Sequence, residues 1–392
     1  MAAGADPDRD AAAVLRPGLH PGLPGPFRRP DHGALPGHQR NRRGRPGGRP
    51  GVEATEAVPG RCPVNVIVLG CGLIAGRWVR ALVADARLTV IALVDPDPAA
   101  ARRIAQRCGL NVPLFPTLEA AVPQLTHTDA APQVVVNLAP ADLHAATTRA
   151  ALEYGYHVLT EKPLALTLKE AERLVSLARR RTLVLSVMSN RGLDSRFLSY
   201  CQAAHALGSG PYVATVEMLV HLPSPGFRSR LTYPALQDLA VHAFDQAQHL
   251  VTARAQTIAC FETPLPRPGG HCSIATAHVR FADGSLLAFR GGFSGPGMRT
   301  PADGTWRIDL PDGHTCCWDG QQTVTTIRPC GQTTAAELTR ASDGHAPRIT
   351  QMIDALYGGP PPPDGLAPLA LLDAAVRSAQ NSAPTDIRQD PR

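Results

Sequence analysis

The segment QDLAVHAFD sets Asp238, His242 and Asp245 at spacings of four and three residues. On a helix these spacings place the three side chains on one face. A histidine can take up or release a proton near neutral pH, and a carboxylate one turn away can orient it or bind substrate hydroxyls. The pattern predicts an acid/base site with an apparent pKa near the unperturbed histidine value of about 6.5, moved in opposite directions by a nearby lysine and aspartate. The alternative is that His242 is only a polar residue on a packed helix face.

A glycine pattern marks a second place where chemistry could occur. VIVLGCGLIAG contains G-x-G-x-x-A through Gly70, Gly72 and Ala75, after an apolar run. Backbone can approach a pyrophosphate closely only where side chains are missing, and a helix that begins near Ile74 offers free N–H groups. Further along, Asp95 ends the segment LVDPDP, where a carboxylate can bind both ribose hydroxyls and repel a 2′-phosphate. We therefore expect NAD rather than NADP; the alternative is a sharp turn that binds nothing.

These residues need elements that position them, and residues 61–187 supply a regular alternation. Apolar, β-branched runs alternate with helix-like segments, which predicts right-handed βαβ units and a doubly wound parallel sheet, that is, a Rossmann domain of the α/β class. The strands are expected at 64–69, 88–94, 133–138, 157–160 and 182–187, and the helices at 75–84, 98–107, 143–154 and 168–180.

Residues 188–385 have a different texture, typical of an α+β domain with an open, mainly antiparallel sheet. Long strand-like runs cover 212–220, 273–281 and 285–293, with hairpin turns at ADG and PDGH. One clear helix is expected near 236–251 and closing helices at 348–356 and 368–379. So few helices cannot cover both faces of the sheet, so we expect a homodimer or homotetramer. Residues 386–392 are expected to be a flexible C-terminus.

Composition limits the classes of protein. No apolar run reaches the roughly 18 residues of a membrane helix, and AAAVL near the start is too short for a signal peptide. The nine cysteines are scattered without metal-ligand spacing, which favours a reducing, cytoplasmic location and no metal site. We expect a protein with a small-molecule substrate and without membrane partners.

Residues 1–60 are rich in glycine and proline and are expected to be a disordered tail or an overextended gene start. They carry nine arginines and six acidic residues, which accounts for half of the net charge of +6. The arginine cluster RNRRGRPGGR could be an anion-binding arm, but a solvated tail is the simpler interpretation. Nucleic acid is therefore not expected as a partner.

A third motif, Glu161-Lys162-Pro163, follows a strand and precedes a helix. Upstream lies NLAPADLHAATTRAALEYGYHVL, with Pro140 and His144. Together with the glycine turn, these segments resemble the Gfo/Idh/MocA family of NAD(P)-dependent oxidoreductases, over about residues 64–385. The resemblance implies a Rossmann domain followed by an open-faced sheet domain, and an Asp four residues before a His on a helix of the second domain.

The resemblance also implies the roles of individual residues. The catalytic residues would be Lys162, Asp238 and His242, with Lys162 beside the nicotinamide and the substrate oxygen. Cofactor contacts are expected from Gly70, Gly72, Leu73, Ile74, Ala75, Asp95, Pro140, His144, Glu161 and Lys162. Substrate contacts are expected from Asn190, Arg191, Tyr233 and Asp238, with Arg228 and Arg230 as weaker candidates. RLTYPALQD stands where members often carry a glycine-rich stretch, so the resemblance does not by itself carry over the substrates of the sugar-oxidising members.

The expected activity is hydride transfer between NAD and a carbonyl or alcohol carbon of a polyhydroxylated small molecule such as a sugar or cyclitol. Two alternatives stay open. One is an enzyme that uses NAD without net redox, for elimination or glycoside cleavage through a transient ketone. The other is a non-catalytic regulator that senses a dinucleotide, although such a regulator does not need Lys162, Asp238 and His242.

Overall fold

The structure is a computed structural model, in which the described residues are 63–125, 133–221, 226–267, 270–294, 297, 299–339, 342 and 344–388. They belong to one compact unit, Val52–Arg392. The tail expected over residues 1–60 lies outside the described residues, as do residues 389–392 of the expected flexible C-terminus. Among the described helices, none is long and apolar enough to cross a membrane.

The first domain is built on a six-stranded sheet in the order β3-β2-β1-β4-β5-β6. Every pairing in it is parallel, which confirms the predicted doubly wound sheet. Its strands are β1 (Val64–Leu69), β2 (Leu88–Val94), β3 (Leu114–Phe115), β4 (Val134–Asn137), β5 (His157–Glu161) and β6 (Leu185–Met188). The strand order reverses between β1 and β4, so their carboxyl ends flank the crevice in which such sheets bind ligands.

Local signals in the sequence fix most helices of this domain. These are α1 (Ala75–Val83), α2 (Pro98–Cys108), α3 (Leu118–Leu125), α4 (His144–Glu153) and α5 (Leu168–Arg180). Helix α2 follows a capping Asp97 and ends at Gly109 in the left-handed conformation. Thr167 accepts a hydrogen bond from the Glu170 N–H at the start of α5. Helix α3, which contains Pro123, was not predicted.

The second domain holds a nine-stranded sheet in the order β14-β13-β12-β11-β7-β10-β9-β8-β15. Only β7 and β10 pair in parallel among these described strands, so the sheet is mainly antiparallel, as predicted. Its strands are β7 (Val213–His221), β8 (Ala255–Arg267), β9 (Gly270–Phe281), β10 (Leu286–Ser294), β11 (Thr305–Asp309), β12 (Thr315–Trp318), β13 (Thr323–Ile327), β14 (Thr333–Glu337) and β15 (Thr385–Asp386).

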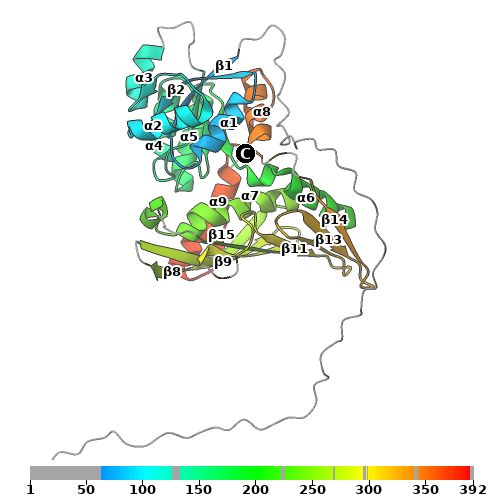
Figure 1. Cartoon of the computed structure of the whole chain (residues 1–392). Helices are drawn as coiled ribbons and strands as arrows, with labels where there is room; N and C mark the ends of the chain where they lie inside the picture. Colours follow the sequence, from blue (N-terminus) through cyan, green and yellow to red (C-terminus); the bar gives the residue numbers. More distant parts are fainter. Residues whose placement is uncertain are drawn as a thin grey trace, which may run out of the picture. The chain divides into compact units, whose positions relative to one another are not determined.

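Helical segments cover one face of this sheet, as Figure 1 shows for α6, α7 and α9. They are η1 (Arg191–Leu193), α6 (Ser195–Leu207), η2 (Gly226–Arg230), η3 (Ala235–Ala240), α7 (Val241–Leu250) and α9 (Leu366–Asn381). In β9 the apolar Ala275, Ala277 and Val279 are buried, whereas His278 is exposed on the opposite face. The apolar residues that were expected to need a partner's cover are therefore covered by this chain's own helices.

Helix α8 (His345–Leu356) packs on the Rossmann domain although it follows the second sheet in sequence. Its Ile349, Met352 and Ile353 share a buried apolar cluster with Trp78 of α1. The His345 ring meets Trp78 edge-on, with ring centroids 5.4 Å apart. Although α8 belongs to residues 188–385, it therefore stabilises the contact between the two domains and does not cover the second sheet.

Candidate active site

Lys162 follows β5 directly, and its ammonium group reaches the segment η3 of the second domain. Its Nζ donates to the backbone carbonyl of Asp238 at 2.8 Å and to Oδ1 of the same residue at 2.9 Å. The other carboxylate oxygen of Asp238 accepts from Arg228 Nε at 2.5 Å. The Lys162 and Asp238 side chains are only 12% and 11% exposed. Asp238 thus lies between two cations, one from each domain.

The charge state of Asp238 follows from these contacts. Burial by itself would raise the pKa of the carboxyl group, but the Lys162 and Arg228 cations outweigh burial and lower the pKa to about 2. Asp238 is therefore ionised at physiological pH and cannot exchange a proton with a substrate there. Its contribution is to hold the Lys162 ammonium group in place.

The helix expected over 236–251 consists of two parts with different geometry. Residues Ala235–Ala240 form a π-helical turn, and α7 continues as an ordinary helix. A π-turn shifts the angular spacing of side chains, and such turns often occur at functional sites. Asp245 interacts with Ser189 and with the Gly192 backbone, and burial raises its pKa to about 7. Asp238 and Asp245 thus have separate partners, and a single face shared with His242 stays a prediction.

His242 lies at the beginning of α7 and is 7% exposed. Burial lowers its pKa well below 6.5, and the neighbouring cations Arg191 and Lys162 lower it further. The apparent pKa near 6.5 expected from the sequence is therefore too high. At pH 7 the ring is neutral, the form that can accept a proton from a substrate hydroxyl.

The two glycines of the β1–α1 turn do different things. Gly70 has φ +96°, and a Cβ there would lie 2.6 Å from the backbone carbonyl of Leu138 at the end of β4. Around Gly72, by contrast, a Cβ would meet no described atom within 4 Å. Gly70 is required by the protein's own backbone, and Gly72 leaves open space in front of the turn.

That open space is bordered by groups that suit a dinucleotide. In the described part of the chain, the N–H groups of Gly72, Leu73 and Ile74 donate no backbone hydrogen bond, and they lie at the start of α1. Such free N–H groups at a helix N-terminus favour an anion. The Asp95 carboxylate stands beside them at the tip of β2, where it accepts from the Cys71 N–H at 2.7 Å. The residues present therefore fit a pyrophosphate at the turn and a ribose at Asp95.

Two predicted cofactor residues instead support the protein's own framework. The His144 ring is 2% exposed, and its two nitrogens lie 2.7 Å from the carbonyl oxygens of Pro163 and Ala139. Glu161 accepts from the Trp78 indole N–H at 2.8 Å. The polar atoms of both residues join the loops after β4 and β5 to each other and to α1, and their direct contact with a cofactor stays a prediction. Ala75 is buried, and Pro140 is exposed next to this region.

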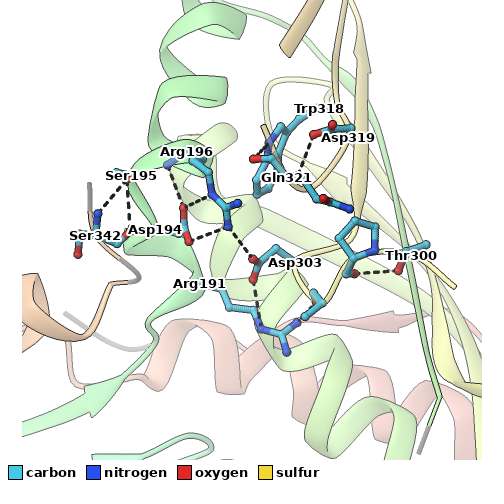
Figure 2. Close-up of polar contacts among 12 residues, drawn as sticks. Arg191, Asp194, Ser195, Arg196, Thr300, Asp303, Trp318, Asp319, Gln321 and Ser342 are labelled. Atoms are coloured by element: carbon cyan, nitrogen blue, oxygen red, sulfur yellow. Dashed lines mark hydrogen bonds and ion pairs between the residues drawn. The ribbon is translucent and has the colours of Figure 1, made fainter. Parts of the chain in front are cut away.

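Among the predicted substrate residues, Arg191 joins the site most clearly. Its side chain is 17% exposed and lies 3.7 Å from Asp303 (Figure 2). Its charge also acts on His242. The Asn190 backbone packs against the start of α8 at Gly344. Tyr233 packs against the apolar core just before η3. Substrate contacts by Asn190 and Tyr233 stay predictions.

The arginines of η2 have separate functions. Arg228 stacks on the rings of Phe227 and Phe293, at 4.6 and 5.1 Å from their centroids, while it binds Asp238. Arg230 forms an exposed two-bond ion pair with Asp142, at 2.9 and 3.1 Å. Sequence reasoning treated both arginines alike, because nothing in FRSR shows which of them faces the helix.

A shallow depression lies elsewhere, on the outward face of the second sheet. Its rim includes Thr215, Thr276, His278, Arg290 and Thr325. None of Lys162, Asp238 or His242 lines it. The chemistry therefore belongs at the junction of the two domains rather than on the sheet.

Residues 64–189 match the sequence model described as "Oxidoreductase family, NAD-binding Rossmann fold" and named GFO_IDH_MocA. The first domain of this chain is a Gfo/Idh/MocA family domain. The matched region carries the glycine turn, Asp95 and Lys162, and the fold that follows it agrees with the open-sheet domain expected from the resemblance.

The curated relatives of this chain are named for different compounds. It is 38% identical over 197 residues to dTDP-3,4-didehydro-2,6-dideoxy-alpha-D-glucose 3-reductase of Saccharopolyspora spinosa, over 49% of this chain and 57% of that one. It is 28% identical to scyllo-inositol 2-dehydrogenase (NADP(+)) IolW of Bacillus subtilis, over 47% and 60% of the two chains. The chain thus spans less than two thirds of these two relatives.

The fold is shared with GenD2 from gentamicin A biosynthesis, a crystal structure in complex with NAD. The TM-score is 0.70 at 23% sequence identity, and the match covers 85% of this chain and all of that one. At this identity the comparison supports the two-domain fold, and the site rests on the residues described above.

Proposed function

We propose that this protein is an NAD(P)-dependent oxidoreductase that moves a hydride between the nicotinamide and a carbonyl or alcohol carbon of a polyhydroxylated small molecule. The observation that carries the proposal is the pair of contacts from Lys162 Nζ to Asp238, at 2.8 and 2.9 Å, beside a neutral His242. These contacts join a residue of the dinucleotide domain to the helix of the second domain. A sensor of dinucleotides has no need of this arrangement.

Each residue of the site has a defined task in this proposal. His242 takes the proton from the substrate hydroxyl in oxidation and returns it in reduction. The Lys162 ammonium group donates to the same oxygen and stabilises the negative charge that develops on it. Asp238 keeps that ammonium group fixed, and Arg191 adds positive potential at the same place.

The dinucleotide would be held by the free N–H groups at the start of α1 and by Asp95. When bound, it supplies or accepts the hydride. The polyhydroxylated substrate class is supported by the relatives, one a sugar reductase and one an inositol dehydrogenase by name.

The test is a screen for NADH or NADPH fluorescence with the purified full chain. The panel contains polyols, cyclitols and aldoses for oxidation, and keto-sugars for reduction. We expect stoichiometric formation or consumption of reduced dinucleotide with at least one class. Product formation without change in the dinucleotide would instead favour the alternative enzyme without net redox. Dinucleotide binding without turnover of any compound would favour a sensor.

For the cofactor, we expect tighter binding of NAD than of NADP, because the Asp95 carboxylate repels a 2′-phosphate. Fluorescence titration with NADH and NADPH measures the preference. Replacing Asp95 with alanine should reduce the difference in affinity between NADH and NADPH, mainly because NADPH then binds more tightly. The preference is a proposal, since one relative is named as NADP-dependent. Equal or tighter binding of NADPH by the unmodified protein would refute the charge argument.

For assembly, we propose a homodimer or homotetramer that uses the outward face of the nine-stranded sheet. This face carries polar residues such as Thr276 and His278, with Val213 and Leu286 exposed at 48% and 42%. An interface on this face would contain both polar and apolar side chains rather than apolar ones alone. Light scattering at micromolar concentration should give a mass of two or four chains. A monomer would contradict the proposal, and His278→Glu should weaken the assembly.

A further inference from the structure

A row of buried charges leads from the loop before β11 to the active site. Figure 2 shows Asp303 between two guanidinium groups: its carboxylate oxygens lie 3.7 Å from Arg191 Nε and 3.5 Å from Arg196 Nη2. Arg196 is in turn held by Asp194, at 3.2 and 3.3 Å. The Asp303 and Arg196 side chains are 15% and 11% exposed. Asp303 therefore holds Arg191 and is itself braced by Arg196.

The segment that carries Asp303 is fixed to the second sheet. Thr300 donates its N–H to the Leu219 carbonyl at 3.1 Å and accepts the Leu219 N–H on its hydroxyl at 2.9 Å. The buried Trp306 donates its indole N–H to the Asp303 carbonyl at 3.0 Å. Gly304 has φ +77°, and a Cβ there would lie 2.9 Å from the Glu217 carbonyl oxygen. The carboxylate thus stands on a rigid support.

Arg191 connects the segment that carries Asp303 to the active site. It begins η1, and its Nη1 donates to the Ala302 carbonyl, next to Asp303 in the chain. The segment η1 packs on α7, where Gly192 lies against Asp245 and His249. The Arg191 guanidinium is one of the two cations, with Lys162, that lower the pKa of His242. The position of Arg191 therefore controls the potential at the ring that exchanges the proton.

We propose that Asp303 is a positioning residue: it holds the Arg191 guanidinium where its charge acts on His242 and on the substrate oxygen. The proposal rests on the proposed function for its effect on turnover, but its electrostatic part concerns the protein alone. Asp303 acts through Arg191 and needs no contact with the substrate. If its carboxylate is removed, Arg191 loses this ion pair, and its guanidinium moves away from His242.

The other charged groups near His242 are fixed by different partners. Lys162 is bound by Asp238, and Asp245 lies one turn further along α7 against Ser189. On α9, which packs on α7, Asp373 and Arg377 pair with each other at 3.0 Å. A change at Asp303 therefore reaches His242 mainly through Arg191.

The experiment follows the His242 ring by NMR in the full chain labelled with ¹³C at histidine Cε1, with His242→Gln to assign the signal. In Asp303→Asn and in Arg191→Gln, the pKa of His242 should rise by roughly one unit, because a nearby cation leaves. Loss of a carboxylate without movement of Arg191 would lower the pKa instead, since an anion leaves. A rise in Asp303→Asn supports the proposal, and a fall or no change overturns it.

Turnover provides the second measurement. The kcat of Asp303→Asn should fall about 10–100-fold with little change in KM, as expected when a charged group is displaced by about an ångström. The matched control is Asp309→Asn, which removes the partner of Arg307 in an exposed pair at 2.6 Å. It should leave both the ring's pKa and kcat unchanged. If the NMR shift occurs but the unmodified protein turns over no substrate, the proposed function fails and the positioning role stands.

A further variant covers the case in which Asp303→Asn does not fold, as judged by circular dichroism. Asp303→Glu keeps the charge but lengthens the side chain by one methylene, so it should displace Arg191 by less. A rise in the pKa of His242 smaller than that of Arg191→Gln then supports the proposal. An unchanged value overturns it, because the guanidinium would then be held by other contacts.

Discussion

Replacing His242 with alanine should lower kcat by about 10²–10⁴, and replacing Lys162 with alanine should lower it by a similar factor. Both groups address one substrate oxygen, so the double variant should lose less than the product of the two factors. NADH affinity should hardly change in His242→Ala, because His242 comes from the second domain. It should weaken somewhat in Lys162→Ala. Steady-state kinetics with the substrate found in the screen, and NADH titration, measure these effects.

Exposed residues of the same types serve as controls. Lys169→Ala on α5 and His278→Ala on the outer sheet face should leave kcat unchanged, since both side chains are exposed and neither belongs to the proposed site. Full turnover in His242→Ala would show that the assignment is wrong. The proton would then pass through Lys162, Tyr233 or water.

The pH dependence tests the neutral state of His242 separately. Because burial, Arg191 and Lys162 all lower its pKa, the oxidation rate should stay level as the pH falls through 6.5 and decline only well below it. His242→Ala should lose this decline. His242 should also make the free energy of unfolding decrease as the pH is lowered from about 6.5. In that range His242 binds a proton in the unfolded chain but not in the folded protein. A decline centred at or above 6.5 would contradict the structure.

The fold could be predicted where local signals mark both ends of an element. Helix α5 was expected at 168–180 and found there, with Thr167 capping its start. Helix α6 was missed, although Asp194 caps it and its buried residues recur at helical spacing. Strand β14 could not have been predicted, because all five of its residues are exposed and no alternation marks it.

The site was predictable in its residue types but not in its pairings. Lys162, Asp238 and His242 stand in recognisable motifs, so their proximity could be expected. The π-turn in η3 and the choice of Arg228 over Arg230 depend on packing between distant segments. The hydrogen bond from Arg191 to Ala302 joins residues 111 positions apart, which no motif connects. The carbonyl partners of His144 are likewise set by tertiary structure.

Replacing Asp238 with alanine should destabilise the fold more than any other single change at the site. It leaves Lys162 and Arg228 buried without their shared carboxylate, and breaking a buried ion pair in this way typically costs about 3–5 kcal/mol. Urea unfolding at pH 7 measures the loss. In addition, kcat should fall about 10²-fold, because nothing then fixes the Lys162 ammonium group. Asp142→Ala is the matched control: it breaks the exposed pair with Arg230, 28% and 54% exposed, and should cost under about 1 kcal/mol.

The stabilisation by Asp238 should depend on pH in a direction that follows from the pKa of its carboxyl group. The pKa of Asp238 is about 2 in the folded protein against 3.8 for a free carboxyl, so its contribution to stability is complete above about pH 4. That contribution, about 2–3 kcal/mol for a shift of this size, is lost as the pH falls toward 2. Asp238→Asn keeps the shape of the side chain and cannot titrate, so its stability should be lower at pH 7 and should approach that of the unmodified protein near pH 2. Equal losses in Asp238→Asn at both pH values would show that the ion pairs with Lys162 and Arg228 do not stabilise the fold, and that Asp238 acts only through its shape.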